Sequence, residues 1–241
     1  METVLQKAPK PKKRKPVSSI GTQKEGSLHR SLKFRYSGKD GETEAQVGDY
    51  ICDGRRASGE LIEVQTSSFG PLKQKIQTLT KKNKVRIVYP IIASKNIELY
   101  DTESRLIRRR KSPVKGSSWD LFSALIYAPE LPLLKNLTIE LAVVDITEKR
   151  IDDGKGSWRR KGVRIMDKYI AAWNESIVLS NLKHYKQFVP FRKNEHFTAR
   201  NLSEKAGISP SLAQKAIYSL SKMGLVERKG KQGNAFVYVR P

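Results

Sequence analysis

The strongest constraint on the fold lies at the C-terminal end of the chain, where helix signals, glycine stops and strand signals alternate. Thr198 is a typical helix N-cap, and Gly207 and Gly224 are typical of positions just past a helix end. A basic, glycine-rich tip at residues 230–233 separates two short β-prone runs. The expected elements are a helix between Thr198 and Gly207, a helix over residues 211–223, and strands over residues 225–229 and 235–239. The end of the chain is therefore predicted to form two helices followed by a β-hairpin.

This pattern resembles the winged helix-turn-helix family over residues 196–241. The resemblance implies that the second helix enters the DNA major groove by its N-terminal half, with the hairpin beside the backbone. The residues expected near the DNA are Ser209, Ser211, Gln214 and Lys215 on the helix and Arg228, Lys229 and Lys231 on the hairpin. Eight Lys and Arg residues against two Glu in this segment favour DNA as the partner. The alternative is a winged helix that binds only proteins.

Net charge limits the partners of the whole chain. There are 47 Lys and Arg residues against 24 Asp and Glu, a formal net charge of +23, and such an excess favours a polyanion. No apolar run is long enough to span a bilayer, and a single cysteine, Cys52, excludes a disulfide framework. We expect a soluble intracellular DNA-binding protein with no membrane partner, cytoplasmic and nucleoid-associated in a bacterium and nuclear in a eukaryote. A homodimer is left open.

The first 24 residues carry seven Lys and Arg and three prolines, so they predict a disordered basic arm. Its run Pro11-Lys-Lys-Arg-Lys15 also resembles a nuclear localisation signal. Residues 25–190 are expected to form one domain, and residues 191–241 a second.

Residues 25–92 predict the order α-β-β-β-α-β. Leu28, Leu32 and Tyr36 recur every four residues, as on one face of a helix, and residues 85–92 form a nearly continuous apolar run, as in a buried strand. Between them, strands are expected over residues 42–47, 49–53 and 60–66, and a helix over residues 69–81. Beyond residue 92 the patterns are weaker: they indicate a hairpin over residues 97–109, helices over residues 119–127 and 165–173, and a strand over residues 137–146.

One group of polar residues falls on this framework with a recognisable spacing. Asp53 is followed ten residues later by Glu63-Val-Gln65 on the next strand. This spacing, in this element order, resembles the PD-(D/E)XK (restriction-endonuclease-like) nuclease superfamily, which includes type II restriction enzymes and archaeal Holliday-junction resolvases. The resemblance implies a catalytic acid at Asp53, a second at Glu63, a helix acid at Glu25, and Glu44 as a weaker addition.

In such a site two carboxylates and a strand carbonyl hold a divalent cation, Mg2+ or Mn2+, which activates water and stabilises charge on the phosphate. The metal ligands are expected to be Asp53 and Glu63, with Asp49 as an alternative to Asp53. A hairpin turn centred on Ser58 favours Asp53, whereas a turn centred on Arg56 favours Asp49. Gly59, a natural tight-turn residue, favours Asp53.

The chain departs from the superfamily at the motif lysine, where it has Gln65. Some members carry Gln there, and others take a lysine from the next helix, a role open to Lys73 or Lys75, of which we select Lys73. The sequence therefore predicts an α/β restriction-endonuclease-like core with an extension and a C-terminal winged helix, acting as a metal-dependent deoxyribonuclease. The alternatives are a DNA-binding regulator with an inactive nuclease-like fold and a partner-binding scaffold.

Overall fold

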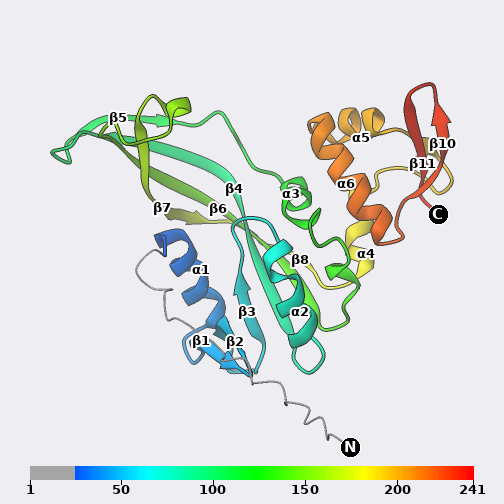
Figure 1. Ribbon diagram of the computed structural model, residues 1–241, viewed down its shortest axis with the longest axis horizontal. Coiled ribbons are helices and arrows are strands. Elements are labelled where there is room, and N and C mark those ends of the chain that lie inside the picture. The colour runs from blue at the N-terminus through cyan, green and yellow to red at the C-terminus, as the bar shows by residue number, and fades with distance from the viewer. Residues whose placement is uncertain (1–24) are drawn as a thin grey trace, which may run out of the picture.

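The computed structural model describes residues 25–241 as a mixed α/β protein with one large sheet and a smaller sheet near the C-terminus (Figure 1). Within these residues the large sheet has eight strands, in the order β1-β2-β3-β4-β6-β7, with β5 paired to β4 and β8 paired to β6. The predicted basic arm, residues 1–24, lies outside the described part of the chain. None of the helices in residues 25–241 has the length and apolar character that crossing a membrane requires.

Helix α1 (Ser27–Ser37) covers one face of the large sheet. Leu28, Leu32 and Tyr36 are buried against apolar residues of β3, β4 and β6, so the helical face expected from their four-residue spacing is confirmed. The Tyr36 hydroxyl also donates a hydrogen bond of 2.8 Å to Glu140 on β6. Burial of a side chain such as Leu32 contributes on the order of 1.5–3 kcal/mol. These contacts fix the orientation of α1 across the sheet.

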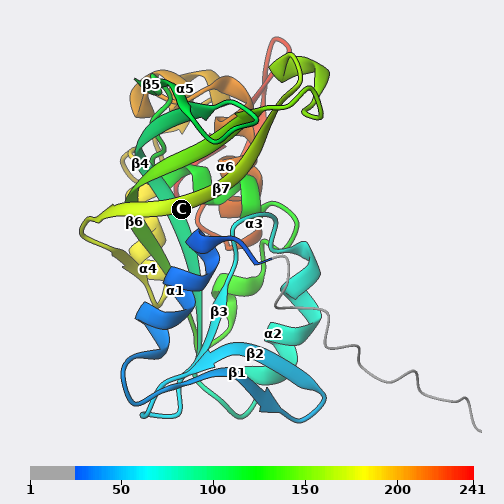
Figure 2. The same cartoon turned by 90° about the vertical axis from the view of Figure 1, so that its left-hand side faces the viewer.

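Three strands and a second helix follow: β1 (Glu42–Val47), β2 (Tyr50–Arg55), β3 (Leu61–Val64), the 3-10 turn η2 (Gly70–Leu72) and α2 (Lys73–Leu79). Helix α2 covers the sheet face opposite α1 (Figure 2). Its Ile76 and Leu79 pack with Leu61 of β3 and Ile87 of β4. Strands β1, β2 and β3 pair antiparallel, whereas β3 pairs parallel with β4. The order helix, three strands, helix, strand agrees with the expected order.

Two strands are much longer than the sequence indicates. Strands β4 (Val85–Tyr100) and β6 (Leu137–Asp152) have sixteen residues each. They pair in parallel from Val85 opposite Leu137 to Tyr100 opposite Ile151, well past the end of β3. The far half of β4 forms the expected hairpin with β5 (Leu106–Lys111). The far half of β6 pairs with β7 (Val163–Trp173), and the loop between them contains the 3-10 turn η5 (Trp158–Arg160). These strands form an arm that extends from the sheet (Figure 1).

The helix predicted over residues 165–173 is wrong, because this segment lies within β7. Ile165, Tyr169 and Trp173 are four residues apart, and a spacing of four places side chains on one face of a helix or, being even, of a regular strand. Periodicity therefore could not distinguish the two. Backbone pairing with residues 144–152 of β6 decides in favour of the strand.

The remaining elements connect the sheet to a C-terminal unit. They are η3 (Ser118–Asp120), α3 (Leu121–Leu125), η4 (Leu131–Leu133), β8 (Ile177–Leu179), α4 (Leu182–Tyr185), η6 (Lys186–Phe188), β9 (His196–Phe197), α5 (Ala199–Ala206), α6 (Pro210–Lys222), β10 (Glu227–Gln232) and β11 (Ala235–Val239). Thr198 caps α5 and Gly207 (φ 63°) ends it, as expected. The hairpin turns at residues 233–234, later than the predicted tip, because Gln232 pairs with Ala235. Helix α6 packs on α3, so one apolar core continues from the large sheet into this unit.

Candidate active site

Three carboxylates lie in a row across the first three strands. Glu44 of β1 and Asp53 of β2 lie between two paired positions of these antiparallel strands. Asp53 and Glu63 of β3 are the next residues beyond the last pair that β2 and β3 form. This register follows from a turn in which Gly59 adopts φ 83° and donates its N–H to Arg56. Asp49 lies exposed in the turn that precedes β2. The register therefore selects Asp53 over Asp49 as the acid opposite Glu63.

Strands β2 and β3 separate at this point, and the Asp53 side chain fills the opening. Its Oδ2 accepts a hydrogen bond of 2.8 Å from the Val64 N–H, a bond that the strand ladder would otherwise supply. The Val64 carbonyl accepts a 3.0 Å hydrogen bond from His29 Nε2, and the same nitrogen lies 3.6 Å from Asp53 Oδ2. His29 Nε2 of α1 thus lies between the Val64 carbonyl of β3 and the Asp53 carboxylate of β2.

Lys33 of α1 joins three of the acids. Its Nζ lies 3.2 Å from Glu25 Oε1, 3.2 Å from Glu44 Oε1 and 3.8 Å from Asp53 Oδ1, and its side chain is only 8% exposed. Burial would lower the pKa of Lys33, but the hydrogen bonds from its ammonium to Glu44 and Glu25 outweigh burial and raise it. Burial likewise opposes ionisation of Glu25, and hydrogen bonds from His29 and Lys33 hold its pKa below the ordinary value. Both groups are therefore charged at neutral pH.

Glu63 is buried on the α2 side of the row. Lys75 Nζ lies 2.5 Å from Glu63 Oε1 and donates a 2.6 Å hydrogen bond to the carbonyl of Ile51. Burial raises the pKa of Glu63; the nearby charge of Lys75 opposes this effect and that of Asp53 adds to it. Burial, together with the charge of Glu63, also raises the pKa of Cys52 to about 12, so its thiol stays protonated. Cys52 is therefore no nucleophile at neutral pH.

The structure places Lys75, rather than the selected Lys73, beside Glu63. Lys73 lies away from the row of acids and pairs with Glu130, Nζ to Oε2, at 3.2 Å. Lys75 and Lys73 are two positions apart, about 200° around a helix, so only one of them can face Glu63. The Gln65 amide is turned toward its own loop rather than toward the acids. Its Nε2 donates a 2.8 Å hydrogen bond to the carbonyl of Ser68, in the loop that follows β3.

Carboxylates outnumber lysines in the cluster, which His29 completes. Its described members are four carboxylates, Glu25, Glu44, Asp53 and Glu63, and two lysines, Lys33 and Lys75. Oxygen ligands of this kind, with the Val64 carbonyl, fit Mg2+ or Mn2+ chemically. Within residues 25–241, however, no three His, Cys, Asp or Glu side chains gather in a geometry ready to hold a metal ion. Binding at this place would require the nitrogens of His29 and Lys33 to move aside.

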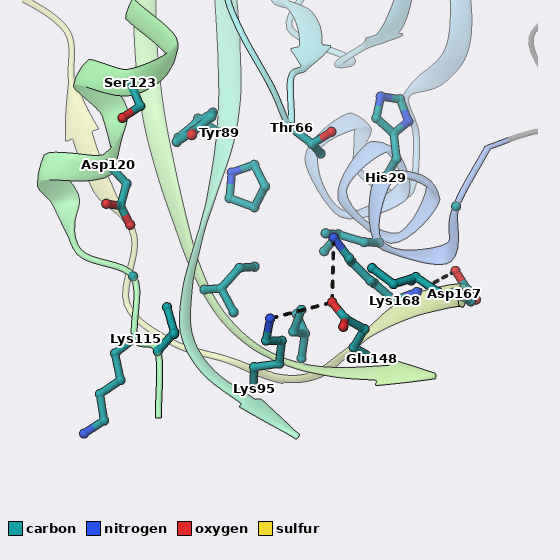
Figure 3. Close-up of a pocket in the computed structure, with 18 of the residues that line it drawn as sticks. His29, Thr66, Tyr89, Lys95, Lys115, Asp120, Ser123, Glu148, Asp167 and Lys168 are labelled. Carbon is teal, nitrogen blue, oxygen red and sulfur yellow. Dashed lines mark hydrogen bonds and ion pairs between the residues drawn. The ribbon is translucent and has the colours of Figure 1, made fainter. Parts of the chain in front are cut away.

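A pocket of about 700 Å³ opens beside the cluster and shares His29 with it. Figure 3 shows His29 and Thr66 on one side of the pocket and Tyr89, Asp120 and Ser123 on the other. At its lower end Glu148 lies 3.7 Å from Lys95 Nζ and 3.9 Å from Lys168 Nζ, as the dashed lines in Figure 3 indicate. The pocket therefore offers space for a ligand next to the acids.

Most of the residues predicted to meet DNA in the C-terminal unit lie at its surface. Ser209, Ser211 and Gln214 are exposed on α6, and Arg228, Lys229 and Lys231 are exposed on β10. Lys215, which was predicted to face DNA, is half-buried instead, and its Nζ lies 3.5 Å from Ser123 Oγ on α3. The exposed face of α6 instead continues through Tyr218, which is 46% exposed. Burial of α6 against α3 determines which side of the helix is free.

His29 stands on the predicted first helix, where the sequence alone gave it no firm role, and Lys33 and Tyr218 were not predicted. A signal for the first two was present, because Glu25, His29 and Lys33 are spaced four residues apart and therefore line one side of α1. Glu25 itself precedes the helix, next to its N-cap Gly26. For Tyr218 no such signal existed, since the free face of α6 depends on how the two units pack.

Comparison with known proteins places this arrangement in a family. Residues 26–180, which include α1, the row of acids, α2 and the arm, match the family described as Domain of unknown function (DUF8091). A protein of Treponema pallidum (strain Nichols), named as an uncharacterized protein, is 26% identical over 221 residues, which cover 91% of this chain and 87% of that protein. No solved structure matches the chain. Since the matched residues make up more than half of the chain, the protein belongs to the DUF8091 family.

Proposed function

We propose that the protein binds DNA and hydrolyses its phosphodiester bonds with the help of a divalent metal ion. The observation that carries this proposal is the position of Asp53 opposite Glu63, at the point where β2 and β3 separate, with the Val64 carbonyl beside them. These three oxygen-bearing groups are the ones that a two-carboxylate nuclease site requires. The observed order helix, three strands, helix, strand supports a PD-(D/E)XK-like core.

The ligands of Mg2+ or Mn2+ would be Asp53 and Glu63, with the Val64 carbonyl as a third. The Glu63 carboxylate, which faces Lys75 on the α2 side, would have to turn toward Asp53 at the opening between β2 and β3. The ion would lower the pKa of a bound water molecule and stabilise charge that develops on the phosphate. The excess of carboxylates over lysines in the cluster favours a cation there. His29 Nε2, which lies within 3.6 Å of both the Val64 carbonyl oxygen and Asp53 Oδ2, occupies the space between two of these ligands.

Lys75 takes the part that the motif lysine has in the superfamily. Its ammonium lies 2.5 Å from Glu63 and is held by the carbonyl of Ile51, so its position is fixed from α2. A cation held there would attract the phosphate and stabilise negative charge that builds up during hydrolysis. Because Gln65 hydrogen-bonds to its own loop, the charge would come from a helix lysine, and of the two α2 lysines Lys75 is the one beside Glu63.

The C-terminal unit would deliver the core to DNA as a winged helix. Two capped helices, α5 and α6, precede the basic hairpin β10–β11, as in that family. The exposed face of α6, with Gln214 and Tyr218, would approach the bases, and the hairpin residues Arg228 and Lys231 the phosphates. The formal charge of +23 predicts that the logarithm of affinity falls linearly with the logarithm of salt concentration.

A cleavage assay tests the proposal. Supercoiled plasmid, branched DNA and single strands are incubated with the protein in Mg2+, in Mn2+ and in chelator. The parent should cut DNA with Mg2+ or Mn2+ present and should not cut it in chelator. The variants Asp53→Asn and Glu63→Gln should each lose cleavage but still bind DNA. Asp49→Asn is the matched control and should cut like the parent, because Asp49 lies in the exposed turn before β2. A parent that cuts none of these substrates overturns the proposal.

A DNA-binding regulator is the second candidate, and two observations favour it. Gln65 stands in the place of the motif lysine and is committed to the Ser68 carbonyl. Within residues 25–241 the acids are paired with lysines rather than gathered as ligands. A regulator would bind DNA with the same affinity in metal and in chelator and would cut nothing.

A further inference from the structure

The end of the arm carries a groove lined by cations. Six basic side chains surround it, drawn from β5, β6 and the loop at η5, namely Arg108, Arg110, Arg150, Arg159, Arg160 and Lys161. Three apolar residues, Ile97, Leu99 and Val163, form the rest of its lining, and its volume is about 310 Å³. Among residues 25–241, no acidic side chain lines it. The groove is therefore a strongly positive site with an apolar base.

Most of these cations have no partner of their own. Arg150 pairs with Glu148 at 2.5 Å, but among residues 25–241 no carboxylate lies within ion-pair distance of the other five. Neighbouring arginines on the arm differ in this respect, because Arg105 pairs with Asp101 and Arg109 with Glu98. Successive side chains of β5 point to opposite faces of the strand, so Arg108 and Arg110 line the groove and Arg109 lies on the other face. Unpaired arginines gathered on one face fit an anionic ligand with several phosphates.

An exposed indole stands next to the groove. Trp158, the first residue of η5, is 84% exposed, and the guanidinium carbon of Arg159 lies 5.7 Å from its ring centre. The loop that presents it is closely built: the Gly156 N–H donates to the Gly162 carbonyl at 2.6 Å. A Cβ at Gly156 would lie 2.0 Å from the Val163 carbonyl oxygen, so only glycine fits there. The indole is thus presented to solvent by a defined loop.

We propose that this groove, with Trp158, binds DNA that carries unpaired nucleotides, the arginines holding phosphates and the indole stacking on a base. The inference rests on the proposed DNA-binding function and adds its substrate class. Basic grooves combined with exposed aromatic rings are suited to single strands, because every base has a face on which a ring can stack. A paired base inside a duplex offers no such face, so the indole selects an unpaired base.

The arm also places this groove at a defined distance from the candidate active site. Glu63 pairs across the sheet with Ile87 of β4, and Ile97 of the groove lies ten residues further along the same strand. Ten strand residues span roughly 33 Å, close to the length of ten base pairs at about 3.4 Å each. We therefore expect cleavage about one helical turn from the unpaired nucleotides.

Binding measured in chelator tests the proposal without requiring cleavage. Fluorescence anisotropy compares a blunt duplex with a duplex of equal length that carries a single-stranded fork. Trp158→Ala should weaken binding of the forked DNA by about 5- to 150-fold, the range expected for a single base stack, and leave the blunt duplex unchanged. Trp158→Phe should retain forked-DNA binding, because phenylalanine can still stack.

The arginines are tested through salt dependence. The double variant Arg108→Gln, Arg110→Gln should reduce the slope of log affinity against log salt on forked DNA by about 1.5. Arg105→Gln is the matched control and should leave the slope unchanged, because its own carboxylate partners already neutralise it.

If Trp158→Ala binds forked DNA as tightly as the parent does, this proposal is overturned. It is also overturned if Trp158→Ala loses the same affinity for the blunt duplex as for the forked one. A parent that binds forked DNA through Trp158 but cuts nothing in metal leaves this proposal standing and overturns only the proposed cleavage.

Discussion

Lys75 on α2 reaches across to Glu63 on β3, with 2.5 Å between its Nζ and Glu63 Oε1, although the two residues are twelve positions apart in the chain. Helix α2 brings them together, because Ile76 and Leu79 bury their side chains against the sheet and so fix which side of the helix faces β3. The pair combines a buried acid with a fixed cation.

The first prediction compares the two lysines of α2. Lys75→Ala should lower kcat for DNA cleavage by about 10²- to 10³-fold, the usual effect of removing one electrostatic contact to a developing charge. Lys73→Ala should remain close to the parent, because Lys73 pairs with Glu130 away from the acids. Single-turnover cleavage rates in Mg2+ measure both. Equal losses in the two variants would contradict the role of Lys75.

The second prediction concerns stability against pH. Burial raises the pKa of Glu63, so the folded protein holds this proton more tightly than the unfolded chain does. Its contribution to stability therefore falls as pH rises from the ordinary glutamate value, about 4.3, through the raised value. Glu63→Gln removes this titration, so its free energy of unfolding should decline less over that range. Urea unfolding at a series of pH values measures the difference, and identical pH slopes would refute the raised pKa.

The third prediction concerns Lys33 and metal. Lys33→Met leaves Glu25, Glu44 and Asp53 facing one another without their shared ammonium. Removal of one partner from a buried ion pair costs about 3–5 kcal/mol, and the half-exposed Glu44 places this case at the lower end. Because a bound cation would replace the missing charge, Mg2+ should raise the Tm of the variant more than that of the parent.

Thermal unfolding with Mg2+ and with chelator measures this effect. Lys39→Met carries the same substitution at an exposed lysine beyond α1 and serves as the control. A metal effect on Tm that is equal in all three proteins would argue against a cation site between these acids.

The fourth prediction concerns the exposed face of α6. The double variant Gln214→Ala, Tyr218→Ala should weaken DNA binding by about 1–3 kcal/mol for each base that these side chains read, without unfolding the unit. Lys215→Ala should change affinity much less, because Lys215 is directed toward Ser123. Anisotropy titrations with duplex DNA compare them. A larger drop in affinity in Lys215→Ala than in the double variant would show that the opposite side of α6 meets DNA.

Local patterns in the sequence predicted much of the framework. The four-residue spacing of Leu28, Leu32 and Tyr36 predicted α1, and Thr198 and Gly207 predicted the ends of α5. These succeed because helix faces and caps depend on neighbours within one or two turns. Gly59 similarly favoured the turn that sets Asp53 opposite Glu63, since a residue that tolerates φ 83° is a local requirement.

What the sequence by itself determined is therefore which residues share one element and one face. Only the tertiary structure decided which faces meet: Lys75 rather than Lys73 beside Glu63, Lys33 among three acids, and residues 165–173 as a strand along β6. The physical reason is that both lysines border the same apolar stripe of α2, and a spacing of four fits a helix or a strand. Burial of Ile76 against the sheet decides which lysine faces Glu63, and backbone pairing with β6 decides that residues 165–173 form a strand. Both contacts involve residues that are distant in the chain.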